Sequence, residues 1–275
     1  MAAHAVDVLV LKLTLTPVLI GASALIGRRW GPSLGGWFVG IPFTSGPIAL
    51  VLSLSNGWQF AAATALGILA GTGSQAAFCL AYSWAATRLG WSLCLLAGVV
   101  CFAVGTLVLD HVSLSAAAAL LIAVIAVAAA LVLLPRSSPG AGRQGLRGPP
   151  ALLDVVTRMV LATGVVLLLT GLATLLGPTL TGLLSPFPLF GAVMMVFSQR
   201  LEGGRAGIAA ARGLLWGLFG AALFFLLVAT LLPHIGLIAF LPAVAVDVAA
   251  QGATFPLVRR RTRVAAGSQP ARAGV

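Results

Sequence analysis

A series of apolar segments, each about 20 residues long and nearly free of charge, most constrains how this chain can fold. A helix of that length crosses the hydrocarbon core of a bilayer and satisfies its own backbone hydrogen bonds there. The segments show no strand-like alternation, so we expect an all-α integral membrane protein. The sequence predicts nine transmembrane helices, at residues 8–27, 34–54, 59–86, 91–109, 112–134, 155–176, 179–198, 206–232 and 235–257.

Composition supports this class and excludes a soluble domain. Hydrophobic residues make up 60% of the chain, charged residues make up 8%, and the mean hydropathy is +1.11. The net charge of +11 does not indicate nucleic-acid binding, because the basic residues lie between apolar segments and not on one aromatic-rich face. We therefore expect a lipid bilayer, and no nucleic acid, as a partner.

The distribution of arginine predicts how the chain is oriented in the membrane. Basic residues gather on the cytoplasmic side of membrane proteins, and here every second loop lacks Lys and Arg. This alternation predicts a multi-pass protein of the bacterial inner membrane, with its N-terminus outside and its C-terminus in the cytoplasm. The first segment has no basic region before it, so we expect it to remain as a span. The basic residues assigned to the cytoplasmic side are Arg28, Arg29, Arg88, Arg136, Arg143, Arg147, Arg200, Arg205 and those within 259–263.

The chain also repeats itself at a shift of 146 residues. Between Gly31 and Gly71 this register gives 11 identities in 41 positions, and most of the matched residues are Gly or Pro. Five helices separate equivalent points, so the second half should run through the membrane in the opposite direction. This predicts an inverted repeat of four helices, one linking helix and four helices. The predicted units are a first repeat at 1–110, a linking helix at 111–135, a cytoplasmic linker at 136–150, a second repeat at 151–258 and a basic tail at 259–275.

The second helix of each half contains a Gly/Pro-rich core that should break it. Proline removes a backbone donor and clashes with the preceding turn. The freed backbone groups beside such breaks bind substrates in many transporters, although prolines can also kink helices only for packing. The residues of this predicted midplane site are Pro42, Thr44, Ser45, Pro186 and Pro188.

Four charged residues lie inside the predicted spans, where charge is costly unless it is paired, snorkels or faces water. Lys12 and Arg158 occupy equivalent repeat positions, and either snorkel to headgroups or attract an anion. Arg212 is a further candidate for anion binding. Asp247 is expected to form a salt bridge with Arg158 or Arg212, or else to carry a proton that couples transport to a gradient.

No motif indicates an enzyme, a cofactor site or a metal site. The sequence lacks a nucleophile elbow, a phosphate-binding loop and an HExxH motif. His4, His111 and His234 have no ligand-like spacing, and Cys79, Cys94 and Cys101 lie within apolar segments. We expect no catalytic activity, no cofactor and no bound metal.

The second half resembles the GlpM-like family of small, four-helix bacterial membrane proteins. The resemblance covers about residues 155–232 and is carried by Arg158, the stretch 182–188 and, entering the next helix, Glu202, Arg205, Gly207, Ile208 and Arg212. The first half matches less closely, since Leu66 stands where Arg212 does. The resemblance implies a fused pair of such units and supplies no substrate.

Two functions are consistent with these patterns. The first is a transporter, or a translocator of an anionic solute or lipid headgroup, with its site between the two broken helices. The second is a non-transporting membrane accessory or scaffold protein. A wet cavity reaching Pro42, Ser45, Pro188 and Arg158 would favour the first, and a dry, Leu-packed interior would favour the second.

Overall fold

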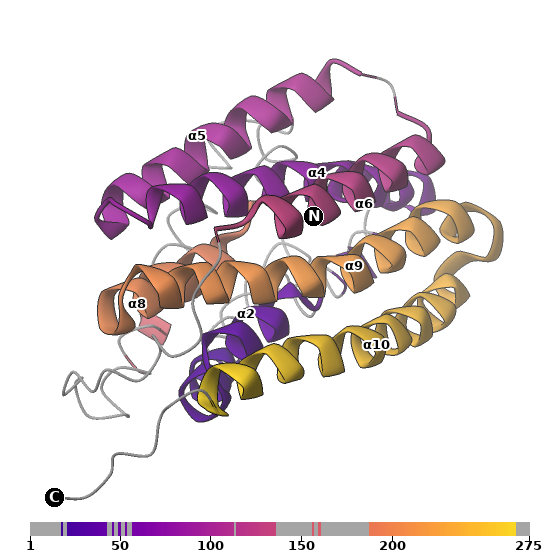
Figure 1. Cartoon of the computed structure of the whole chain (residues 1–275). Coiled ribbons are helices and arrows are strands. Elements are labelled where there is room, and N and C mark those ends of the chain that lie inside the picture. The colour runs from indigo at the N-terminus through magenta and orange to yellow at the C-terminus, as the bar shows by residue number, and fades with distance from the viewer. Residues whose placement is uncertain are drawn as a thin grey trace, which may run out of the picture.

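The computed structural model describes residues 18, 21–42, 46, 49–50, 53, 57–112, 114–135, 156, 159–160 and 187–267, with side chains of the last helix as far as Val258. The described part is helical and contains no strand, which confirms the all-α class. Residues 21–30 form a helix before the named elements. The named elements are α2 (Pro32–Gly40), α4 (Trp58–Ala85), α5 (Trp91–Asp110), α6 (Ala116–Leu133), α8 (Leu189–Glu202), α9 (Gly204–Ile235), the 3-10 turn η1 (Gly236–Ala239) and α10 (Phe240–Gly267) (Figure 1).

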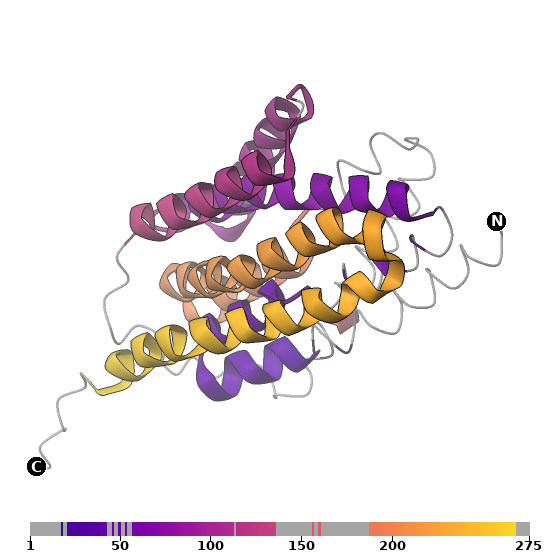
Figure 2. The same cartoon turned by 90° about the vertical axis from the view of Figure 1, so that its right-hand side faces the viewer.

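Four helical stretches among the described residues are long and apolar enough to cross a membrane. They are Trp58–Ala85, Trp91–Asp110, Ala116–Leu133 and Gly204–Val258. The last stretch is a hairpin, because the chain turns back at Gly236 and α10 packs against α9 (Figure 2). A multi-pass membrane protein is therefore plausible by length and composition. The count of nine spans stays a prediction.

Two of the helix ends that differ from the sequence-based boundaries follow from local chemistry. The fifth predicted span begins at Ala116 and not at residue 112, because the Ser115 side chain accepts a hydrogen bond from the Ala118 N–H (3.3 Å) and caps the helix there. The last helix continues to Gly267, beyond the predicted end of the span at residue 257. Its Arg-, Val- and Ala-rich continuation contains no helix breaker before Gly267.

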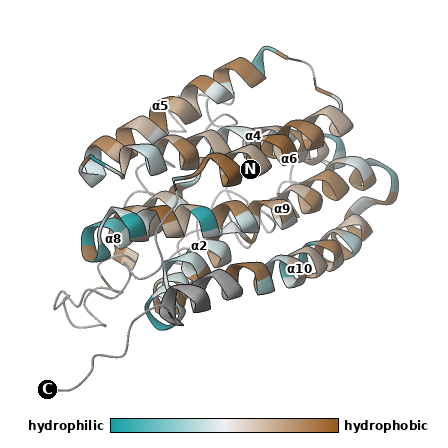
Figure 3. Cartoon of the chain, in the orientation of Figure 1, coloured by the Kyte–Doolittle hydropathy of each residue, from teal (hydrophilic) through white to brown (hydrophobic). Residues whose placement is uncertain are grey.

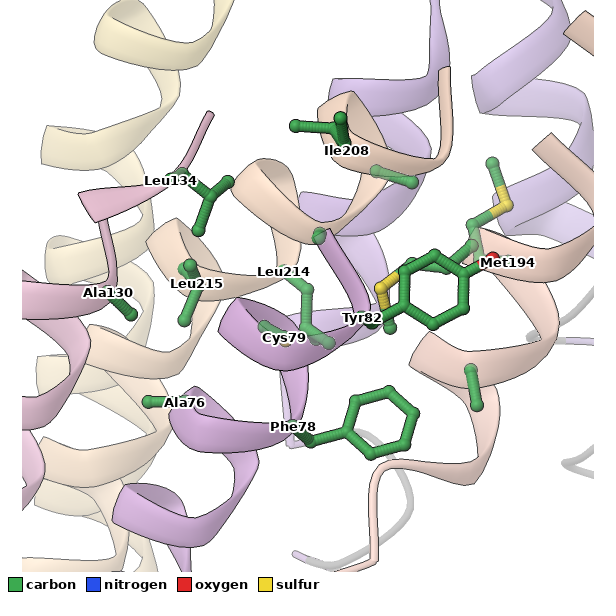
Figure 4. Packing of buried hydrophobic residues seen from close by; sticks show 14 of the residues in the cluster. Ala76, Phe78, Cys79, Tyr82, Ala130, Leu134, Met194, Ile208, Leu214 and Leu215 are labelled. Carbon is green, nitrogen blue, oxygen red and sulfur yellow. The ribbon is translucent and has the colours of Figure 1, made fainter. Parts of the chain in front are cut away.

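Helix α9 is the centre of the described bundle. It contacts α2, α4, α6, α8 and α10, whereas α5 packs on the outer side of α4 (Figure 1). Two buried apolar clusters surround it. One includes Phe78, Tyr82 and Leu215 (Figure 4), and the other includes Leu69 and Phe225.

The outer surfaces of α5 and α6 are apolar, as a lipid-facing surface requires. Polar residues lie mainly near the helix ends, and apolar residues cover the lengths of the helices (Figure 3). The large exposed side chains include Leu96, Val100 and Val104 on α5, and Leu121 and Ile125 on α6. In water such a surface would be an aggregation hazard. It is suited to contact with lipid acyl chains.

Helices α4 and α9 pack side by side in opposite directions. At one end a Cβ on Gly204 would meet the carbonyl of Ala86, and at the other end Gly236 lies against the Trp58 ring. Each helix begins after a glycine with a left-handed backbone, φ 86° at Gly57 and φ 90° at Gly203. These two glycines are equivalent in the repeat register of 146 residues.

The contact between α2 and α9 is a close approach of two backbones. A Cβ on Gly40 would lie 2.7 Å from the Gly217 Cα, and a Cβ on Gly217 would lie 2.7 Å from the carbonyl oxygen of Trp37. Side chains larger than hydrogen therefore have no room here. Small residues of this kind let helices associate in membranes, where lipid provides little hydrophobic drive between helices.

Replacing Gly217 tests this close approach. Gly217→Ala should lower the stability of the detergent-purified protein by about 1–3 kcal/mol, because the new methyl group would press on backbone that cannot rotate away. Gly252→Ala is the matched control, since a Cβ on that α10 glycine meets nothing within 4 Å. The control should keep or slightly raise the melting temperature. Equal melting temperatures for the two variants would contradict the close packing.

Single cysteines test the predicted orientation. In a Cys79→Ala, Cys94→Ala, Cys101→Ala background, Gln59→Cys should react with a membrane-impermeant maleimide in intact cells, because its end of the bundle has no arginine in the predicted loops. Arg88→Cys, exposed at the opposite end of α4, should react only after the membrane is opened. The reverse labelling pattern would invert the topology.

Candidate functional site

Helix α2 breaks where Pro42 predicts. It ends at Gly40, and Ile41 adopts an extended backbone with φ −72° and ψ 138°. The Ile41 N–H donates to the Phe38 carbonyl (3.3 Å), and Pro42 has no N–H to continue the helix. The prediction of a helix break at Pro42 is confirmed. Among the described residues, the Phe38 carbonyl therefore accepts from Ile41 in a tighter turn instead of from position 42.

At the equivalent position of the other half, a helix begins. Phe187 and Pro188 are not helical, and α8 begins at Leu189. In the register of 146 residues they correspond to Ile41 and Pro42. The residues before Phe187 lie outside the described part, so the break predicted at Pro186 and Pro188 stays a prediction. The Phe187 ring packs edge-on against Phe78 (5.9 Å between centroids) and Phe102 (5.3 Å).

A row of buried polar side chains on α10 faces α9 and α2. Asp247, Gln251 and Thr254 are spaced by four and three residues, so they share one face of the helix. Their exposed fractions are 5%, 5% and 8%. The Trp37 indole N–H of α2 donates to Thr254 Oγ1 (3.1 Å), and Gln251 Nε2 donates to the Gly217 carbonyl of α9 (2.9 Å). This row joins three helices.

Two members of this row, Asp247 and Gln251, form a carboxylate–amide pair in direct contact. Gln251 Nε2 also donates to Asp247 Oδ1 (3.2 Å). Gln251 Oε1 is buried and has no hydrogen-bond partner among the residues that the structure describes. Within the described part of the chain, Asp247 forms no ion pair. Gly220 of α9 has no room for a side chain, because a Cβ on it would lie 2.5 Å from Asp247 Oδ1 and from Gln251 Nε2.

The pair lies near the middle of the apolar part of α10, at the level of the first helix break. Asp247 is about 10 Å along the helix axis from Phe240 and about 16 Å from Val258, at 1.5 Å per residue. Trp37 contacts Thr254, and the break follows Trp37 by about one helical turn. Gln251 lies one turn before Thr254 on α10, and it contacts Gly217, the residue of α9 on which Gly40 packs. The broken end of α2 and the carboxylate–amide pair therefore border the same stretch of α9.

Arg212 of α9 contacts a different helix from the one that carries Asp247. Its guanidinium donates to the carbonyls of Leu131 (3.5 Å) and Pro135 (3.2 Å) at the C-terminal end of α6. A cation there satisfies unpaired carbonyls and interacts favourably with the helix dipole. The structure thus brings Arg212 to α6 and Asp247 to Gln251. The two charges expected to pair are held by different neighbours.

Five of the predicted site residues lie outside the described residues. They are Lys12, Thr44, Ser45, Arg158 and Pro186. Pro42, Pro188, Arg212 and Asp247 are the predicted residues that the structure describes. It places Pro42 directly after α2, which packs on α9 and α10, and Pro188 next to Phe187, whose ring packs on those of α4 and α5.

The sequence reasoning missed Gln251, Thr254 and Trp37. The signal for the first two was their spacing from Asp247, which puts three polar residues on one helix face within an apolar span. Trp37 gave no comparable signal, because an indole in a membrane helix is common. Its partner depends on the packing of α2 against α10.

A second polar cluster has a structural role. Tyr82 on α4 donates its hydroxyl to Gln199 Oε1 (2.6 Å), and Gln199 Nε2 donates to the Leu89 carbonyl (3.0 Å). Gln199 thereby ties α8 to the α4–α5 connection. Nearby, the Arg200 guanidinium lies over the Trp91 ring at 5.0 Å.

The comparisons with known proteins give no assignment. No protein-family model, curated protein or solved structure matches the chain. The resemblance to the GlpM-like family stays a prediction, and the function is argued from the site alone.

Proposed function

We propose that this protein is a transporter of the bacterial inner membrane, with its site at the broken end of α2 against α9 and α10. One observation carries the proposal: a buried carboxylate–amide pair, Asp247 and Gln251, lies near the middle of the apolar length of α10, beside a helix break. Ionisable residues at that depth are costly and mark ion or substrate pathways by default. Broken helices supply the backbone groups that transporter sites use.

The arrangement of the two halves supports the same proposal. Helices α4 and α9 are equivalent in the repeat register and pack in opposite directions. The observed break at Pro42 corresponds in this register to Pro188, directly before α8, and the left-handed glycines Gly57 and Gly203 are also equivalent. An inverted repeat of nine spans requires such relations, and inverted repeats provide the two alternating openings of many transporters.

The proposed substrate is an anionic solute or a lipid headgroup. Lys12 and Arg158 are the cationic groups proposed to attract it, since inversion places them at opposite depths. Arg212 is better explained as a structural residue, because its guanidinium caps α6. The orientation proposed is an external N-terminus and a cytoplasmic C-terminus.

A second candidate is a non-transporting membrane scaffold, and one observation favours it. Phe78 and Phe102 pack on Phe187, next to Pro188, and this aromatic packing suits a structural role. A scaffold does not need the carboxylate–amide pair, because burying an ionisable carboxylate within an apolar helix is costly. We therefore place transport first.

Uptake into proteoliposomes tests the choice between these functions. The purified full chain should take up phosphate-bearing or organic anions from a screening set, with a rate that changes when a pH gradient is imposed. Lys12→Gln and Arg158→Gln should each reduce uptake at least about tenfold, the effect of losing one charged contact of roughly 1.4 kcal/mol. Arg88→Gln, on the exposed α4–α5 connection, is the matched control and should retain uptake. Normal uptake by the Lys12 and Arg158 double variant would remove both from the mechanism, and no uptake of any anion would favour the scaffold.

A further inference from the structure

We propose that Asp247 and Gln251 form the binding site of a small monovalent cation, Na⁺ or a proton, with the broken end of α2 beside it. This inference names the coupling ion of the proposed transporter and rests on that function for the ion's role. The evidence for ion binding itself comes from the contacts of Asp247 and Gln251 and does not depend on transport. The expected anion and this cation would then cross together, with partial compensation of charge.

The first argument is the unbalanced charge of the pair. Asp247 is 5% exposed, and the hydrogen bond that it accepts comes from a neutral amide. An ionised carboxylate away from water is costly unless a cation or several donors compensate it. The compensation must come from an ion that enters the site or from a residue outside the described part.

Neighbouring helices offer no compensating side chain within the described residues. Helix α2 contains no titratable residue, and α9 presents Gly217 and Gly220 to the pair. The adjoining turns of α10, residues 240–254, contain no other charged residue. Arg212, the nearest cation along α9, donates to the C-terminal end of α6.

The second argument is independent and concerns the amide. Gln251 is also 5% exposed, and its Nε2 already donates to the Gly217 carbonyl and to Asp247. Its Oε1 is buried without a donor. An orphaned carbonyl oxygen costs roughly 1–3 kcal/mol, so such an atom calls for a partner. A bound Na⁺ would be coordinated by this oxygen, and a protonated Asp247 would donate a hydrogen bond to it.

The third argument is the partial negative charge at the C-terminal end of α2. The C-terminal end of a helix carries a partial negative charge, and α2 ends at Gly40, which packs directly on Gly217. The carbonyl of Gly217 accepts from Gln251 on its other side. A carboxylate, an amide oxygen and a helix C-terminus thus border the same stretch of α9. All three attract a cation, and in transporters the C-terminal ends of half-helices and unwound carbonyls bind coupling ions.

Melting temperatures of the detergent-purified full chain test this site without any transport measurement. The wild type is compared with Asp247→Asn and Gln251→Leu, and with Asp110→Asn as the matched control, since Asp110 is exposed at the end of α5. Each protein is measured in choline chloride, NaCl and KCl at constant ionic strength, at about pH 5 and about pH 8. Monodispersity on size exclusion confirms that each variant is folded.

The two ions give different results. If the ion is Na⁺, the wild type and Asp110→Asn should melt at least about 3 °C higher in NaCl than in choline chloride, and both site variants should lose this rise. If the ion is a proton, the wild type should lose stability from about pH 5 to about pH 8 relative to Asp247→Asn, with no effect of NaCl. The sign follows because the folded site holds the proton that the unfolded chain releases.

The inference is overturned if the wild type and Asp247→Asn respond alike to NaCl, KCl and pH, as they would if Lys12 or Arg158 compensated the carboxylate. Cation-dependent stability without anion uptake would keep this site and contradict the transport function. Anion uptake that is the same in Asp247→Asn and wild type would keep transport and remove the cation from it.

Discussion

The described bundle depends on the backbone contact between α2 and α9. Gly40 and Gly217 meet so closely that neither position has room for a methyl group. In a membrane, close van der Waals packing of this kind holds helices together, since lipid is as apolar as the side chains it would replace. The contact also fixes where the broken end of α2 lies, because the break follows Gly40 directly.

Around this contact, the polar groups of the interior divide into two kinds. Arg212, Tyr82 and Gln199 each have partners that explain their presence, namely helix-end carbonyls or one another. Asp247 and Gln251 join α10 to α9 but leave a buried oxygen without a donor. The hydroxyls of Ser74, Ser83 and Thr106 are also buried without a hydrogen-bond partner among the described residues, so an unpaired oxygen alone does not mark a site. The ionisable carboxylate of Asp247 is what sets the pair apart, because burying such a group within an apolar helix is costly.

Two positions that are equivalent in the sequence register have different surroundings. Ile41 and Pro42 follow the glycine contact and the end of α2, which packs on α9 and the polar row of α10. Phe187, directly before Pro188 and α8, lies among the rings of α4 and α5. The equivalence in sequence therefore does not extend to the neighbours of the two positions.

The sequence by itself determined the features that depend on local chemistry. The length of the apolar runs fixed the helical class and the long helices α4, α5 and α6 to within a few residues, because a chain in lipid must satisfy its own backbone. Pro42 fixed the end of α2, because a missing N–H acts on its own turn whatever the neighbours are.

Only the tertiary structure decided which side chains meet. Asp247 was expected to pair with Arg158 or Arg212, yet Arg212 reaches α6 and Asp247 contacts Gln251, while Arg158 lies outside the described residues. The face that a helix presents to each neighbour depends on the packing of segments far apart in sequence, such as Trp37 against Thr254, which are 217 positions apart. Periodicity shows that polar residues share a face, but the partner of that face is set by the close approach of glycines on other helices.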